Sequence, residues 1–216
     1  MVEVNGPRPD IAASAVHEIW QRAQDVSRTL DRVRQDPALS AIVDPAWIAV
    51  AGHTLGGTAA LALGGGGFDA DAFVSACATK TEDPDCGWFR ARGVSLAEVD
   101  RGMLERAHRD PGIGTVIAID PEYADVFRAP SLTEQATKIR VIWLGAPEHP
   151  QVAEAGVPQA VIGTATIYDA FPVCTPKGTF ILAEDGADAT LCDTEAAARA
   201  RIHGGIAKRL RTALDR

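Results

Sequence analysis

The stretch GHTLGG, at positions 52–57, has the residue types and spacing of a turn that presents a nucleophile. In such an elbow a strand turns sharply into a helix, and the central hydroxyl projects at the top of the sheet. Gly52 and Gly56 hold the glycine positions of the usual Gly-x-Ser-x-Gly pattern, but Thr54 holds the serine position. A β-branched residue fits poorly at the positive φ that this position often has. The hexapeptide alone therefore leaves open an acyl-transfer site with an unusual nucleophile and a glycine-rich turn of purely structural use.

Elements that could position this turn are predicted along the rest of the chain. Short, nearly all-apolar runs predict buried strands at 47–52, 115–120, 139–145 and 159–166. Apolar residues at helical spacing predict helices at about 12–35, 56–63 and 202–214, and a capping box at 95–98 predicts a further helix start. Strands that alternate with helices predict the α/β class, with a mostly parallel sheet covered by helices on both faces.

The composition argues against several function classes. The chain has 216 residues, 46% of them hydrophobic, and a net charge of −8. This length suits one domain, residues 1–216, in which 68–112 is a possible cap or loop insertion. The acidic charge argues against a nucleic-acid partner, and no apolar run is long enough to span a membrane. No Cys, His or carboxylate cluster has metal-ligand spacing, so we expect no metal and no cofactor.

Longer stretches of the chain carry a family pattern. They are DPAWIAVAGHTLGGTAALAL at 44–63, QRAQDVSRTLDRV at 21–33, ACATKTEDPDC at 76–86 and CTPKG at 174–178, followed by LC and a final helix with Arg201 and His203. Together these stretches resemble bacterial α/β-hydrolases of the predicted dienelactone hydrolase family, whose elbow typically reads Gly-His-Ser-x-Gly-Gly. The resemblance implies an α/β-hydrolase-like fold of carboxylester-hydrolase ancestry. It places the elbow at Gly52, His53, Thr54, Leu55, Gly56 and Gly57.

The resemblance also implies the other members of a hydrolytic site. Thr54 stands at the nucleophile position, and the backbone N–H of Leu55 is one oxyanion donor. The acid should follow the strand at 139–145, where Glu148 is the local carboxylate. The family's catalytic histidine would fall at Ile167, but no histidine occurs from 150 to 202. Because a triad needs a base within reach of the nucleophile, we expect weak or no esterase activity.

The start of the chain departs from the family as well. The family has several strands ahead of this first helix, and one of their loops supplies the second oxyanion donor. Only about ten residues precede the helix here, without a signal-peptide layout. We therefore expect an N-terminally short sheet with the strand at 47–52 on an open edge. That strand has no Lys or Pro to blunt the edge, so we expect a partner there, either a second copy or a second chain.

None of the five histidines is a strong candidate for a replacement base. His53 is expected to pack or hydrogen-bond beside the elbow, where the family also has histidine. His17 and His108 are expected on helices, in contact with solvent. His149 is expected in an exposed loop, pointing away from the nucleophile. His203 belongs to the non-catalytic pattern of the last helix.

The four cysteines divide into two local pairs that coincide with the family's cysteine positions. Cys77 lies near Cys86, and Cys174 lies near Cys192. Two disulfides would imply an oxidising compartment, periplasmic or secreted. The alternative is four buried free thiols in a cytoplasmic protein.

Three functions follow from these observations. The first is an α/β-hydrolase-like protein with a degenerate triad and little esterase activity. The second is an active hydrolase that uses Thr54 on a small ester or lactone, with a base that the sequence does not identify. The third is a binding or partner subunit that uses the cleft of the former catalytic site, beside the elbow, or the open edge of the sheet. The loops around 68–112 should set specificity, but no motif there names a ligand.

Overall fold

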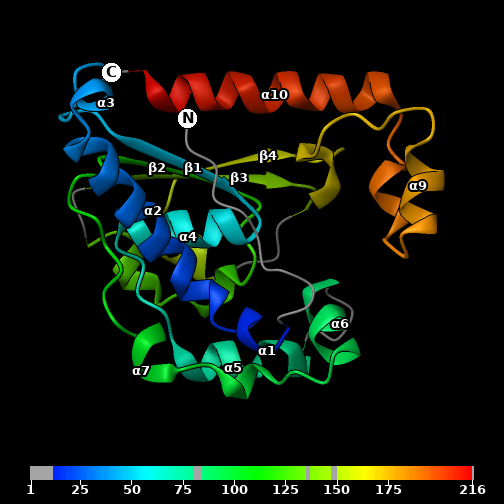
Figure 1. Cartoon of the computed structure of the whole chain (residues 1–216), viewed down its shortest axis with the longest axis horizontal. Helices are drawn as coiled ribbons and strands as arrows, with labels where there is room; N and C mark the ends of the chain where they lie inside the picture. Colours follow the sequence, from blue (N-terminus) through cyan, green and yellow to red (C-terminus); the bar gives the residue numbers. More distant parts are fainter. Residues whose placement is uncertain (1–11, 80–83, 135–136, 147–149, 216) are drawn as a thin grey trace.

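The computed structural model describes residues 12–79, 84–134, 137–146 and 150–215. Four strands form a parallel sheet in the order β1 (Ala49–His53), β2 (Thr115–Ile119), β3 (Lys138–Leu144) and β4 (Gln159–Ile162). Each strand pairs with the next strand in sequence, and helical segments connect them (Figure 1). The predicted α/β class with a parallel sheet is confirmed.

Helices cover both faces of this sheet (Figure 1). α4 (Leu55–Gly64) packs on β1 and β2 with α2 (Glu18–Gln35) outside it, and α10 (Ala196–Leu214) runs along the opposite face. The other helices are α1 (Ala12–Ala15), α3 (Pro37–Ser40), α5 (Ala70–Thr79), α6 (Pro84–Ala91), α7 (Arg101–Leu104), α8 (Pro150–Glu154) and α9 (Gly178–Glu184). Short 3₁₀ turns are η2 (Leu96–Glu98), η3 (Ala124–Val126), η4 (Ala129–Leu132), η5 (Ile167–Ala170) and η6 (Ala189–Cys192).

The two central strands divide the interior into two apolar clusters. Successive strand side chains point to opposite faces, so alternate residues enter different clusters. Val116 and Val141 belong to the larger cluster, beneath α2 and α4. Ile117 and Ile142 belong to the smaller cluster, which α10 closes with Ile202 and Ile206. The burial of β2 on both faces agrees with its continuous apolar sequence.

The outer strands are less buried than their apolar sequences predict. Ala49 and Ala51 of β1 are exposed, and Val161 of β4 is 44% exposed. Strands form at both predicted places, 47–52 and 159–166, but the prediction that they are buried is wrong, because each strand has a single neighbour in the described sheet. The second strand also ends earlier than predicted, at Ile162. Within the described sheet, β1 lies at one edge and β4 at the other.

Two helix predictions need correction. The helix predicted at 12–35 is divided at 16–17, where His17 Nδ1 accepts a hydrogen bond from the backbone N–H of Asp100 (3.3 Å). The capping box of Ser95 and Glu98 is present, but it begins only the 3₁₀ turn η2. Val99 is extended after this turn, and Asp100 then caps the short helix α7 through the N–H of Met103.

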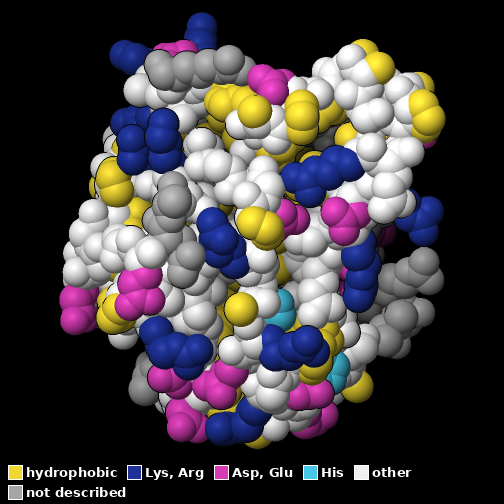
Figure 2. Space-filling view, turned by 90° about the vertical axis from the view of Figure 1, so that its left-hand side faces the viewer, with side chains coloured by type: hydrophobic (Ala, Val, Ile, Leu, Met, Phe, Trp, Pro, Cys, Tyr) yellow, Lys and Arg dark blue, Asp and Glu magenta, His cyan; other side chains and the backbone are white. Residues whose placement is uncertain are grey.

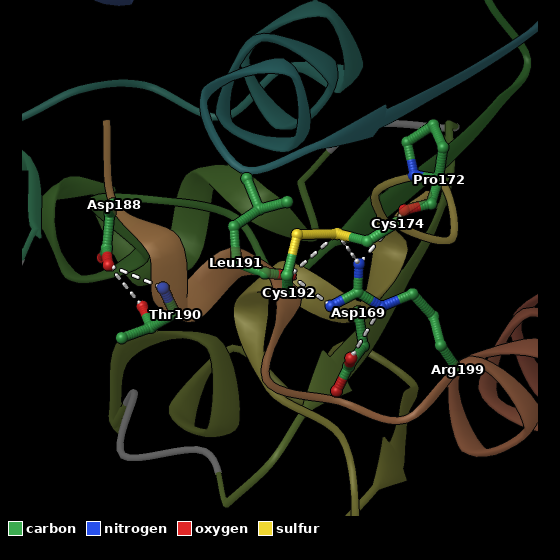
Figure 3. The surroundings of a disulfide bond; sticks show 8 residues. All are labelled: Asp169, Pro172, Cys174, Asp188, Thr190, Leu191, Cys192 and Arg199. Carbon is green, nitrogen blue, oxygen red and sulfur yellow. Dashed lines mark hydrogen bonds and ion pairs between the residues drawn. A yellow bond between two sulfur atoms is a disulfide. The ribbon is translucent and has the colours of Figure 1, made fainter. Parts of the chain in front are cut away.

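Both predicted disulfides are present. Cys77–Cys86 joins α5 to α6, and Cys174–Cys192 joins the segment after β4 to η6. The second bridge lies beside Arg199 of α10, whose guanidinium points into the loop that the bridge closes (Figure 3). The described residues contain no free cysteine.

Arg199 is the centre of a saturated polar cluster under this disulfide. Its side chain is 1% exposed, and Nε lies 3.3 Å from the carboxylate of Asp169, which is equally buried. Nη1 donates to the carbonyl of Pro172 (3.1 Å), and Nη2 donates to the carbonyl of Leu191 (Figure 3). Burial alone would raise the pKa of Asp169, but hydrogen bonds from Thr194 and Thr166 and the charge of Arg199 hold it below its usual value.

The surface carries charges of both signs. On the face shown in Figure 2, Lys and Arg side chains are interspersed with Asp and Glu, so neither sign forms a continuous patch there. Among the helices of the described residues, none combines the length and the apolar character needed to cross a bilayer.

Candidate active site

The turn after β1 has the backbone geometry of a strained elbow. Thr54 has φ 51° and ψ −123°, between the end of β1 and the start of α4. This conformation is rare for any residue with a Cβ and more so for a β-branched one. The backbone N–H of Thr54 donates to Ile119 O (3.0 Å) at the end of β2, and Thr54 O accepts from Thr58 N (3.1 Å). The sheet and the helix thus hold the turn from both sides.

Two of the three glycines are required by close packing of strand and helix. A Cβ on Gly52 would overlap the carbonyl group of Gly56. A Cβ on Gly57 would lie 3.1 Å from the Cα of Pro121, in the loop after β2. Gly56 itself has open space around its missing Cβ, so its side of the turn tolerates a side chain.

Thr54 lines a pocket, and its hydroxyl is hydrogen-bonded to the backbone. Oγ1 donates a hydrogen bond to the carbonyl of His53, the preceding residue (2.8 Å). The adjoining pocket has a volume of about 280 Å³. Its walls come from α1, α2, α5, α6, the elbow and the loop after β2, with the residues Ala15, Val16, Ile19, Arg22, Thr54, Leu55, Phe73, Trp88, Phe89, Glu122 and Tyr123.

His53 is adjacent to Thr54 in sequence, but its ring is used elsewhere. Nε2 lies 3.0 Å from the carbonyl oxygen of Ile167. The ring also packs in a T-shaped arrangement with Phe171, with the two ring centroids 5.3 Å apart. Because a carbonyl can only accept, Nε2 carries the proton and donates it to this bond. Burial lowers the pKa of His53, against the opposing effect of the bond to Ile167. Because Nε2 is the donor in the bond to Ile167, this nitrogen takes no proton from Thr54.

The position at which the family resemblance would place a catalytic histidine is thus close to the elbow. Ile167 occupies it, in η5, and touches the elbow through its backbone and not through an ionisable side chain. The sequence-predicted acid Glu148 and its neighbour His149 lie outside the described residues. Within the described ranges, no group of three or more His, Cys, Asp or Glu side chains could hold a metal ion.

The other described histidines are committed to backbone contacts away from Thr54. His108 is buried and lies outside any helix, so its predicted solvated helical position is wrong. Its Nε2 donates to the carbonyls of Met103 and Leu104 at the end of α7, and the loop after that helix brings the ring back to them. His203 Nε2 lies 3.0 Å from the carbonyl of Phe171.

A backbone N–H without an acceptor among the described residues lies at the start of α4. Leu55 is the first residue of that helix, so its N–H has no partner within the helix, and no other described residue accepts from it. Leu55 also lines the pocket next to Thr54. The helix N-terminus favours negative charge at this point.

Several pocket residues escaped the sequence reasoning. Trp88 and Phe89 of α6 and Phe73 of α5 form aromatic walls, and Glu122 and Tyr123 come from the loop after β2. One sequence signal was visible: Arg22 stands three residues after Ile19, on the apolar stripe of its helix. A charged residue on a buried stripe needs a partner, which is a reason to suspect a site.

Comparisons with protein-family models, with curated proteins and with solved structures found no match to this chain.

Proposed function

We propose that the chain has an α/β-hydrolase-like fold of carboxylester-hydrolase ancestry, with Thr54 at the nucleophile position and weak or no esterase activity. The observation that carries this proposal is the conformation of Thr54, whose φ of 51° combines with a strand-to-helix turn and an adjoining pocket. Strain of this kind persists only where the surroundings enforce it, and it gathers at functional sites. The N–H of Leu55 adds a donor where an oxyanion would form.

Low activity follows from what surrounds the hydroxyl. An unactivated hydroxyl is a weak nucleophile, and a general base raises rates by about 10²–10⁴. Thr54 Oγ1 donates to the carbonyl of its neighbour, and none of the described histidines is bonded to it. The methyl group of threonine also occupies space beside the oxyanion donor.

Hydrolysis of p-nitrophenyl acetate tests the proposal. The wild-type rate should equal that of Thr54→Ala, and Thr54→Ser should gain less than about tenfold because serine also lacks a base here. Thr29→Ala, on α2 away from the pocket, is the matched control. Turnover approaching about 10 s⁻¹, a common value for enzymes, that disappears in Thr54→Ala would establish the alternative, an active hydrolase.

A second candidate, a binding protein that uses the same cleft, is favoured by one specific feature of the pocket. Arg22 lines it and lacks hydrogen-bond acceptors among the described residues.

A further inference from the structure

Arg22 is an arginine with almost no protein partner. Its side chain is 12% exposed, and it lines the pocket from α2. Its one described contact with a charge is an ion pair in which Nε lies 3.3 Å from Glu18 Oε2, without hydrogen-bond geometry. A guanidinium carries five N–H donors, and the buried Nε of Arg22 has no hydrogen-bond partner among the described residues.

This situation is unfavourable unless something else fills the site. A charged group removed from water needs both a counter-charge and hydrogen bonds. The carboxylate of Glu18 supplies a counter-charge, but it lies beside the Nε of Arg22 and forms no hydrogen bond with that atom. Burial raises the pKa of the Glu18 carboxyl, against the opposing effect of Arg22, so this counter-ion is itself in an unfavourable environment. Arg22 lines the pocket, so its guanidinium is placed to pair with an anionic ligand there.

The rest of the pocket suits an apolar body. Phe73, Trp88 and Phe89 contribute aromatic rings, and Ile19 and Leu55 contribute aliphatic walls. The volume of about 280 Å³ is near the lower end for small-molecule sites, enough for one ring and a short chain. Glu122 also lines the pocket, and its carboxyl group makes the wall less suited to a ligand with two negative charges.

We infer that this pocket binds a small organic monoanion with an apolar body, whose anionic group pairs with Arg22 while the body packs among the aromatic residues of α5 and α6. The inference deepens the proposed function by naming a ligand class for the same pocket, and it rests on that proposal only for the pocket's role. No reaction at Thr54 is required. A planar oxyanion such as a carboxylate matches the guanidinium best, because two parallel N–H groups can bind its two oxygens.

Calorimetric titration at pH 7 with 3-phenylpropionate and its uncharged isostere 3-phenylpropanamide tests this inference. The acid should bind the wild-type protein about tenfold more tightly than the amide, which is the lower end for hydrogen bonds to charged groups. Arg22→Met should remove this preference. Arg28→Met is the matched control on the same helix, since Arg28 is 70% exposed and outside the pocket, and it should leave the preference intact.

Two further variants keep the test decisive if Arg22→Met is poorly folded. Arg22→Lys keeps the charge but loses the paired N–H groups, so the acid should bind more weakly while still exceeding the amide. Glu18→Gln removes the competing carboxylate, so the acid should bind more tightly than to the wild type. Equal binding of acid and amide to the wild-type protein, or an equal loss in Arg22→Met and Arg28→Met, overturns the inference. Either result leaves the ester-turnover test of the proposed function untouched.

Discussion

Arg199 and Arg22 are both nearly buried, but they differ in how many polar partners surround the guanidinium. Arg199, 1% exposed, is surrounded by a carboxylate, two carbonyls and the sulfur of Cys174 (Figure 3). Arg22, 12% exposed, has one ion pair and no hydrogen bond among the described residues. A saturated buried charge fixes structure, here the segment that the second disulfide closes. An unsaturated one beside a pocket is available to a ligand.

Replacing each arginine in turn should give the largest contrast. Arg199→Met leaves Asp169 buried without its counter-charge, and we expect a loss of about 3–5 kcal/mol in the free energy of unfolding. Arg22→Met should cost no more than about 1 kcal/mol, because the variant loses one ion pair and also removes a buried Nε that has no hydrogen bond. Urea unfolding followed by circular dichroism measures both. Similar losses in the two variants would show that Arg22 is as structural as Arg199.

Removing the Cys174–Cys192 disulfide tests how much this bridge adds to the stability of the segment that Arg199 also holds. The Cys174–Cys192 bridge closes a sequence separation of 18 residues, and the chain-entropy model gives about 3 kcal/mol for the double serine variant. Cys77→Ser/Cys86→Ser, with a separation of 9 residues, is the control and should lose slightly less. If the Cys174 variant loses far less than the control, Arg199 holds the loop without the bridge. Free-thiol labelling of the unreduced, denatured wild type should find no reactive cysteine.

The strain at the elbow should appear as a gain in stability. Thr54→Gly removes the side chain at φ 51°, where strain costs about 1–3 kcal/mol, and adds less than about 1 kcal/mol of chain entropy. We expect a net gain of about 1 kcal/mol by urea unfolding. Thr29→Gly, inside α2, is the control and should lose stability, because glycine disfavours helix interiors. A loss in Thr54→Gly would mean that the turn is not strained.

The smallest expected effect is a pH dependence of folding stability that comes from His53, whose ring is bonded to the carbonyl of Ile167. Burial lowers the pKa of His53 in the folded state, so the unfolded state binds a proton more readily. Stability should therefore fall as the pH drops below about 6.5, the ordinary histidine value. Burial lowers the pKa of His108 too, so His53→Gln should reduce this fall without abolishing it. Melting temperatures between pH 7.5 and 5 measure the slope, and an unchanged slope in His53→Gln would contradict the assignment.

Local sequence was sufficient to predict most of the framework. The apolar runs predicted four strands because continuous Val, Ile and Leu segments leave few alternatives to a sheet, and the paired cysteines are joined as the family resemblance implied. The glycine spacing located the strand-to-helix turn, because only glycine permits the contact of Gly52 with Gly56. These features depend mainly on residues that are close together in the sequence, so the sequence alone can indicate them.

Other features depend on contacts between distant segments, and only the tertiary structure decided them. The exposure of β1, the burial of His108 and the short turn after Ser95 each follow from which elements meet. The pocket is the clearest case, since it joins α2, α6 and the loop after β2 beside Thr54. The sequence shows only that Arg22 lies on the apolar stripe of its helix. Whether its charge is satisfied depends on every side chain around it, and no local pattern contains that information.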